Sequence, residues 1–249
     1  MIKAVLFDVD NTLLDFDAYV RESIKNGFRE FGLGDYDDTM FDTFTEINNR
    51  LWRQIEQGSI TYSALYANRW NLIFEALGVS FDGERFETYF REQLFDNAIP
   101  IDGAIKILRY LEGRYLLYVA SNGPYEQQLH RLETGGLAPY LTHSFISENV
   151  GAEKPSRQFF DVCMERLRGR DVSEEKEILI EESPAADKDL SQLRPEEVMM
   201  IGDSLTADMG GGIAYGMKTC WYDRDGKGLP QGMAVDHVVR SLGEIRDIL

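Results

Sequence analysis

Two aspartates stand at the end of the first apolar run of the chain, and their spacing raises a question of chemistry. Residues 2–6 indicate a buried strand, and Asp8 and Asp10 follow it in the stretch FDVDNT. In an extended backbone, side chains two residues apart point to the same face. Two carboxylates that close repel each other and resist burial. The pair therefore predicts either a cation between the two carboxylates or water close to them.

Other polar residues follow later apolar runs in the same way. They are Ser121, Asn122 and Gly123 after YLLYVA, Lys154 shortly after SFIS, and Asp203 and Asp208 after VMMIG. In a parallel sheet, ligands bind beyond the carboxyl ends of the strands, so these side chains would gather at one edge. Each residue alone fits an ordinary turn, helix cap or solvated surface position. Together they predict one site with four carboxylates, one amine and one hydroxyl.

This set of side chains favours a hard cation and a phosphate group. Carboxylate oxygens are the ligands of Mg²⁺, and the three histidines, His130, His143 and His237, have no zinc-type spacing. Lys154 and the backbone amides after Ser121 would suit phosphate oxygens. Neither a G-x-x-x-x-G-K-[ST] phosphate loop nor a nucleophile-elbow pattern occurs in the sequence.

The elements that must position these residues alternate between strand and helix from about residue 100 onward. Such alternation predicts parallel strands joined by crossover helices. The strand at the start of the chain has no strand partner nearby, so it must join the same sheet. We therefore predict an α/β core with a Rossmann-like parallel sheet, formed by residues 1–14 and 99–249.

The stretch between these two parts of the core predicts a helical insertion over residues 15–98. Apolar residues recur there at spacings of three and four, and Gly32, Gly58 and Gly78 follow the periodic segments. Four consecutive amphipathic helices with short links are typical of a small helical bundle. The many aromatic residues of this stretch are expected to form its core.

Composition narrows the possible partners. The chain has 249 residues, a hydrophobic share of 43% and a formal net charge of −17. So negative a protein is not expected to bind a nucleic-acid polymer or an anionic membrane, because both require cationic surfaces. Cys163 and Cys220, the only cysteines, stand in apolar contexts and are expected to be buried free thiols. No run is long enough for a signal segment or a membrane span, so we expect a cytoplasmic protein.

Two further stretches call for interpretation. Residues 169–195 are acidic and long for a link between a helix and a strand, which favours a solvated surface insertion, although a partner-binding role stays open. The stretch GGGIAYG, residues 210–216, lacks the third glycine of a dinucleotide-binding fingerprint and follows no strand directly. Close packing of a helix on the sheet is the interpretation we prefer for these glycines.

Four stretches of the sequence resemble the motifs of a known family. DVDNT, Ser121 after a strand, Lys154 in EKP, and GDSLTAD resemble, in order, the four motifs of the haloacid dehalogenase-like hydrolases. The helical insertion resembles the first type of helical cap in that family. NNRLWRQIEQGSIT, RLETGGL and GGIAYGMKTCW resemble the subgroup of pyrimidine 5'-nucleotidases, a weaker match than that to the family.

The resemblance implies a role for each motif residue. Asp8 would be the nucleophile that forms an aspartyl-phosphate, and Asp10 would protonate the leaving alkoxide and then activate water. Lys154 would neutralise charge between the phosphate and the nucleophile. The implied phosphate-binding residues are Asp8, Ser121, Asn122, Gly123 and Lys154. The implied holders of Mg²⁺ are Asp8, the backbone carbonyl of Asp10, Asp203 and Asp208.

The expected activity is therefore Mg²⁺-dependent hydrolysis of a phosphate monoester, with pyrimidine nucleoside 5'-monophosphates as the favoured substrates. Trp52, Gly58 and Arg69 in the insertion are candidates for substrate choice, with the insertion acting as a lid, and Trp52 could equally be a core residue of the bundle. A phosphosugar phosphatase or mutase of the same family stays open, whereas a non-enzymatic binding module is disfavoured by the intact motifs. A monomer and a homodimer are both compatible with the sequence. Asn11 stands where many members have glycine, and asparagine tolerates the turn expected there.

Overall fold

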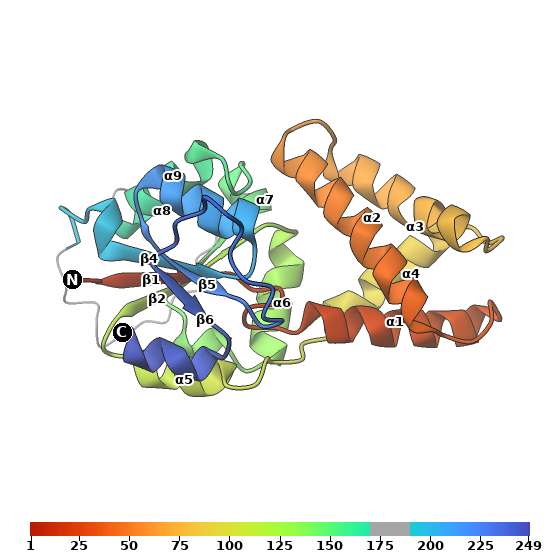
Figure 1. The fold of residues 1–249 in the computed structure, drawn as a ribbon, viewed down its shortest axis with the longest axis horizontal. Helices are drawn as coiled ribbons and strands as arrows, with labels where there is room; N and C mark the ends of the chain where they lie inside the picture. Colours follow the sequence, from red (N-terminus) through yellow and green to blue (C-terminus); the bar gives the residue numbers. More distant parts are fainter. Residues whose placement is uncertain (170–189) are drawn as a thin grey trace. The chain divides into compact units, whose positions relative to one another are not determined.

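The computed structural model of the chain describes residues 1–169 and 190–249. The chain folds into two compact units, one formed by Met1–Asp15 and Pro100–Leu249 and the other by Phe16–Ile99 (Figure 1). These bounds differ by one residue from those expected from the sequence. The acidic segment predicted as a surface insertion, residues 169–195, lies mostly outside the described residues.

The larger unit is built on a six-stranded parallel sheet with the order β3-β2-β1-β4-β5-β6 (Figure 1). The strands are β1 (Ala4–Phe7), β2 (Leu116–Ser121), β3 (His143–Ile146), β4 (Val198–Gly202), β5 (Lys218–Tyr222) and β6 (His237–Val239). The first strand lies between β2 and β4, so the chain order of the strands reverses beside it. In open parallel sheets, ligands bind in the crevice at such a reversal. The predicted parallel α/β fold is confirmed.

The sequence forms these strands because both faces of the sheet are covered. Every residue of β1, β2 and β4 is buried, and their sequences AVLF, LLYVAS and VMMIG are correspondingly rich in apolar residues. The helices of this unit are α5 (Ala104–Leu111), α6 (Tyr125–Thr134), α7 (Ser147–Val150), α8 (Arg157–Leu167) and α9 (Gly211–Tyr215). Figure 1 shows α8 and α9 on one face of the sheet and α5 on the other.

Two segments predicted as ordinary helices take tighter or wider forms. The stretch after β4 begins as a π-helix (Leu205–Gly210) that continues into α9, and the final helix is a 3-10 helix (Leu242–Asp247). Two further short 3-10 helices span Ala138–Tyr140 and Pro195–Glu197. A Cβ atom on Gly211 would lie 2.5 Å from a ring carbon of Phe160. This glycine lets α9 approach α8 closely. A Cβ atom on Gly212 would lie 3.0 Å from Cγ2 of Thr219 in β5, so that glycine lets α9 pack closely on the sheet, as the sequence predicted.

The smaller unit is a bundle of four helices. They are α1 (Phe16–Phe31), α2 (Asp38–Glu56), α3 (Tyr62–Leu77) and α4 (Gly83–Asp96). Side chains of Asp37, Thr61 and Asp82 accept hydrogen bonds from backbone N–H groups at the starts of α2, α3 and α4. Trp70, 1% exposed, lies in an aromatic core with its ring centroid 4.2 Å from that of Phe86. Among the described residues, no helix combines the length and apolar character needed to cross a membrane.

The two connections between the units are paired with each other inside the larger unit. Leu14 forms an antiparallel bridge with Pro100, and the Ile101 N–H donates to the Leu13 carbonyl at 2.9 Å. Leu13 and Leu14 are fully buried. The outgoing and returning chains are therefore fixed side by side at the edge of the core.

Candidate active site

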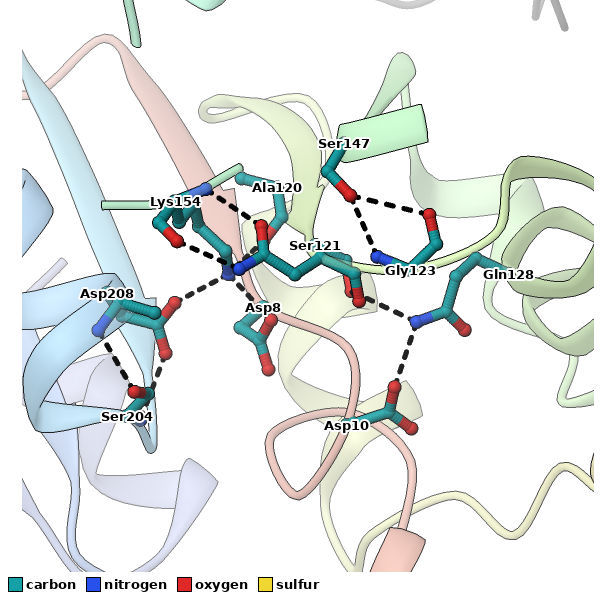
Figure 2. A network of polar contacts seen from close by, with 12 residues as sticks. Asp8, Asp10, Ala120, Ser121, Gly123, Gln128, Ser147, Lys154, Ser204 and Asp208 are labelled. Carbon is teal, nitrogen blue, oxygen red and sulfur yellow. Dashed lines mark hydrogen bonds and ion pairs between the residues drawn. The ribbon is translucent and has the colours of Figure 1, made fainter. Parts of the chain in front are cut away.

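Lys154 lies at the centre of a buried ionic cluster beyond the end of β1 (Figure 2). Its Nζ donates to Asp8 Oδ1 at 2.8 Å, to Asp208 Oδ1 at 2.6 Å and to the Ala120 carbonyl at 2.6 Å. An ammonium group has three donors, so all of them are used. Lys154 is 1% exposed, Asp8 7% and Asp208 0%. Lys154 thus supplies positive charge to Asp8, whereas Asp10, the second aspartate of the first motif, pairs with Arg131.

The charge balance of this cluster leaves room for a further cation. Burial raises the pKa of Asp8 to about 7, although Lys154 acts in the opposite direction. Burial also lowers the pKa of Lys154, but Asp208 and Asp8 outweigh that effect and the net shift is upward. Two carboxylates with one ammonium carry one excess negative charge. A cation beside Asp8 would favour its ionised form.

Three carboxylates converge in a way that fits a divalent cation. Oxygen atoms of Asp8, Asp203 and Asp208 all lie within 4.8 Å of one another. The backbone of Asp203 is fixed by a hydrogen bond, because the indole N–H of Trp221 donates to its carbonyl at 2.8 Å. Carboxylate oxygens in this arrangement are ligands suited to Mg²⁺. The side chain of Asp10, the fourth predicted carboxylate, points instead toward Gln128 (Figure 2).

Gly202, at the end of β4, makes room for one of these carboxylates. A Cβ atom on Gly202 would lie 2.1 Å from Asp208 Oδ2 and 2.4 Å from its Cγ. The same Oδ2 accepts a hydrogen bond from the Ser204 N–H at 3.0 Å, which fixes the carboxylate against the backbone (Figure 2). The glycine of the GDSLTAD stretch therefore has a steric role that sequence reasoning did not assign.

Replacing Gly202 with alanine is expected to displace the Asp208 carboxylate. A methyl group forced into a packed interior typically costs about 1–3 kcal/mol of stability. We expect Gly202→Ala to lower the free energy of unfolding by that order and to raise the Mg²⁺ concentration needed for half-maximal activity. Urea unfolding and a Mg²⁺ titration of activity measure the two effects.

Gly243→Ala is the matched control for this experiment. The nearest atom to a Cβ there, Ser241 Oγ, lies at an ordinary contact distance of 3.8 Å. Both quantities should stay near their parent values in the control. An unchanged Mg²⁺ requirement and an unchanged unfolding free energy in Gly202→Ala would contradict the steric argument.

The loop after β2 is held by paired hydrogen bonds. The Asn122 side chain donates to the Lys154 carbonyl at 2.9 Å and accepts from the Lys154 N–H at 2.8 Å. The Gly123 N–H donates to Ser147 Oγ at 3.0 Å (Figure 2). Asn122 and Gly123, which the sequence placed at a phosphate site, thus fix the loop that carries Ser121. The Ser121 hydroxyl faces Asp10 across Gln128.

Asp10 is positioned by its own turn and by helix α6. The turn passes through Asn11, which has φ 59 and is the only non-glycine residue with positive φ in the described parts of the chain. Asparagine thus adopts the left-handed conformation expected at this position. Arg131 and Gln128 of α6 both contact the Asp10 carboxylate, the former as an ion pair at 2.8 Å. Sequence reasoning gave neither residue a role, although Arg131 begins the RLETGGL stretch and both lie one helical turn apart just after the Ser121 loop.

The candidates for substrate choice occupy different positions in the helical unit. The half-buried Trp52 ring lies 5.7 Å from that of Tyr62, and Tyr62 stacks on Tyr66 at 6.4 Å. These three rings form a partly exposed aromatic row across α2 and α3. Gly58 is exposed and has φ 67, as the turn after α2 requires.

Arg69 has a role that the sequence did not predict. Its Nε and Nη2 donate to the two carboxylate oxygens of Glu87 at 3.0 and 2.6 Å, and its Nη1 donates to Asn48 at 2.9 Å. Arg69 is 4% exposed and Glu87 is 4% exposed. These contacts of Arg69 join α2, α3 and α4 inside the bundle. We therefore assign Arg69 to the interior of this unit and not to substrate contact.

The parallel sheet with a reversal at β1 and the acidic cluster with its buried lysine define a class of enzyme. A family model of haloacid dehalogenase-like hydrolases matches residues 2–216, and the chain belongs to this family. The predicted family and enzyme class are confirmed.

Individual relatives cover nearly the whole chain. YfnB of Bacillus subtilis is 30% identical over 247 residues, which span 99% of this chain and 95% of YfnB. The pyrimidine 5'-nucleotidase PynA of Streptococcus pneumoniae is 32% identical over 222 residues, 89% of this chain and 84% of PynA. The pyrimidine 5'-nucleotidase YjjG of Escherichia coli is 28% identical over 245 residues, 98% of this chain and 96% of YjjG. A crystal structure of YfnB bound to magnesium superimposes with a TM-score of 0.83 and covers 100% of this chain and 98% of that one.

Proposed function

We propose that this hydrolase is a Mg²⁺-dependent phosphatase that acts through an aspartyl-phosphate on pyrimidine nucleoside 5'-monophosphates. The observation that carries the chemistry is the pairing of Asp8 with Lys154 at the end of β1, at 2.8 Å and almost out of solvent. The substrate class is supported by two relatives, PynA and YjjG, that are named as pyrimidine 5'-nucleotidases.

In the first step, an Asp8 carboxylate oxygen attacks phosphorus. The bond from Asp8 oxygen to phosphorus forms as the bond to the leaving alkoxide breaks, and Asp10 gives that alkoxide its proton. In the second step, water attacks the same phosphorus, Asp10 takes a proton from the water, and the bond to Asp8 breaks. Splitting hydrolysis in this way is covalent catalysis.

Charge neutralisation and positioning supply most of the rate in phosphoryl transfer. Lys154 offsets one of the two negative charges of Asp8 and Asp208, and the Ser121 hydroxyl is the donor toward a phosphoryl oxygen. Asn122 and Gly123 keep the Ser121 loop in place through Lys154 and Ser147. The contacts of Lys154, Asn122 and Gly123 are all made within the protein, so they do not depend on bound substrate.

Asp8, Asp203 and Asp208, together with the backbone carbonyl of Asp10, would hold Mg²⁺. The fit rests on the three carboxylates within 4.8 Å of one another and on the excess negative charge of the cluster. When bound, the cation would neutralise phosphoryl oxygens and lower the repulsion between them and the attacking carboxylate.

A substrate panel tests the proposed specificity. We expect the highest kcat/KM with dUMP, dTMP or UMP, lower values with AMP, and the lowest with ribose 5-phosphate. If a base stacks on the Trp52 ring, loss of that ring should remove about 1–3 kcal/mol of binding free energy, roughly a factor of 5 to 150. Trp52→Ala should therefore lower kcat/KM for nucleotides by that factor and leave ribose 5-phosphate nearly unaffected. Release of free phosphate is the measurement.

Phe95→Ala is the control, because Phe95 is an aromatic residue of the same helical unit that is 39% exposed. It should not change the ranking of the substrates. Highest activity on a sugar phosphate with inert nucleotides would reject the nucleotidase proposal and leave a general phosphatase. Net isomerisation of a sugar phosphate with little free phosphate would indicate a mutase.

A further inference from the structure

Helix α6 places two buried polar side chains against the proposed proton-transfer residue. Gln128 is 2% exposed and Arg131 1% exposed, and they lie three residues apart on one face of the helix. Neither belongs to the four motifs that the sequence analysis singled out. Buried polar groups of this kind are costly unless they are fully paired, so their contacts are informative.

The contacts of Gln128 link two of the motifs to each other. Its Nε2 donates to Asp10 Oδ2 at 2.8 Å and to Ser121 Oγ at 3.0 Å (Figure 2). Arg131 Nη1 donates to Gln128 Oε1 at 2.8 Å and forms an ion pair with Asp10 Oδ1 at 2.8 Å. One amide group therefore connects the carboxylate of the first motif with the hydroxyl of the second.

The orientation of the Gln128 amide follows from which of its neighbours donate and which accept hydrogen bonds. A guanidinium group can only donate, so the amide oxygen of Gln128 must face Arg131. The amide nitrogen then faces the carboxylate and the hydroxyl, and both of its N–H groups are used. Arg131 thus determines which end of the Gln128 side chain meets Asp10.

A consequence follows for Ser121. Its Oγ accepts a hydrogen bond from Gln128, and a serine hydroxyl has a single proton of its own to donate. The contact in which that proton is donated within the protein is a long one, 3.5 Å to the Asn122 carbonyl, which a phosphoryl oxygen could replace. The Asp10 side chain is 31% exposed, although its Oδ1, which faces Arg131, is buried.

We infer that Gln128, oriented by Arg131, is a positioning residue of the reaction, which aims the Asp10 carboxylate and sets the donor direction of Ser121. The inference rests on the proposed phosphatase function. It predicts that the loss of activity depends on the leaving group. The leaving group of an alkyl phosphate needs a proton, whereas that of nitrophenyl phosphate barely does. Loss of Gln128 should harm the first reaction more than the second.

The test compares Gln128→Met, which keeps the length and loses both donors, with the parent on dUMP and on p-nitrophenyl phosphate. Misplacing a reacting group by about 1 Å can cost roughly 10²-fold in rate. We expect kcat on dUMP to fall by about that factor, with a several-fold smaller loss on p-nitrophenyl phosphate. Asp10→Asn should show the same selective pattern with larger losses.

Two variants guard against a trivial result. Gln127→Met changes the neighbouring buried residue of α6, which lies outside the four contacts above, and should leave the ratio of the two activities unchanged. Gln128→Leu likewise lacks both donors and adds no charge beside Asp10, so it should reproduce the pattern if Gln128→Met does not fold. Equal losses on both esters, or none, would overturn the positioning role. A parent protein that releases no phosphate from either ester would overturn the proposed function itself.

Discussion

Asp8→Asn is expected to abolish turnover and leave the fold intact. The amide has the shape of the carboxylate but lacks the negative charge that attacks phosphorus. Removing the nucleophile of a covalent enzyme typically costs on the order of 10⁴-fold or more. The protein should remain folded, because Asp208 still pairs with Lys154 at 2.6 Å and the excess negative charge of the cluster disappears. Phosphate release and urea unfolding without Mg²⁺ measure both quantities.

A trapping experiment identifies the residue directly. Acid quenching of the parent protein with phosphate-labelled substrate should leave the label on the peptide that contains Asp8. Asp102→Asn, which removes an exposed carboxylate of the same unit, should retain parent activity. Substantial turnover by a folded Asp8→Asn protein would show that another group attacks phosphorus.

Removal of Mg²⁺ is expected to have the next largest effect. Burial raises the pKa of Asp8 to about 7 in the protein alone, so without a further cation a large share of the nucleophile would be protonated near neutral pH. A metal ion can contribute several kcal/mol of charge stabilisation. Excess chelator should therefore reduce activity by roughly 10³-fold or more, and added Mg²⁺ should restore it.

Asp203→Asn tests the ligand set behind that expectation. Asp203 is half-buried and supplies one of the three convergent carboxylates. Calorimetric titration should show weaker Mg²⁺ binding to this variant than to the parent, and the Mg²⁺ requirement of catalysis should rise in parallel. Parent activity in excess chelator, or equal Mg²⁺ affinity in the two proteins, would remove the basis for a carboxylate-bound cation.

The strands and the four helices of the insertion could be predicted because the residues that form each element carry its signal within a short stretch of sequence. A strand covered on both faces needs an unbroken apolar run, and β1, β2 and β4 are such runs. Gly78 ends α3 in a left-handed conformation, which is the signal that the sequence carries. The sequence predicted a parallel sheet but not the order of its strands, which the structure gives as β3-β2-β1-β4-β5-β6.

Contacts between distant residues were less accessible to sequence reasoning. Arg69 pairs with Glu87 on another helix, and nothing in the local pattern identifies one as the partner of the other. Gln128 and Arg131 look like the polar face of an amphipathic helix until Asp10 is seen beside them. Polar side chains that are buried by long-range pairing have no periodic signature, which is why sequence reasoning proposed the motif residues and gave no role to the residues that contact them.

The bridge between Leu14 and Pro100 has a consequence for how this protein could diversify. Because the chain leaves the core and returns to it at adjacent points, the sheet is insensitive to what lies between them. Doubling the length of such an inserted loop costs only about 0.6 kcal/mol of closure entropy. Selection can thus lengthen, shorten or exchange the insertion without shifting the pairing of any strand, so the insertion can evolve at a different pace from the core.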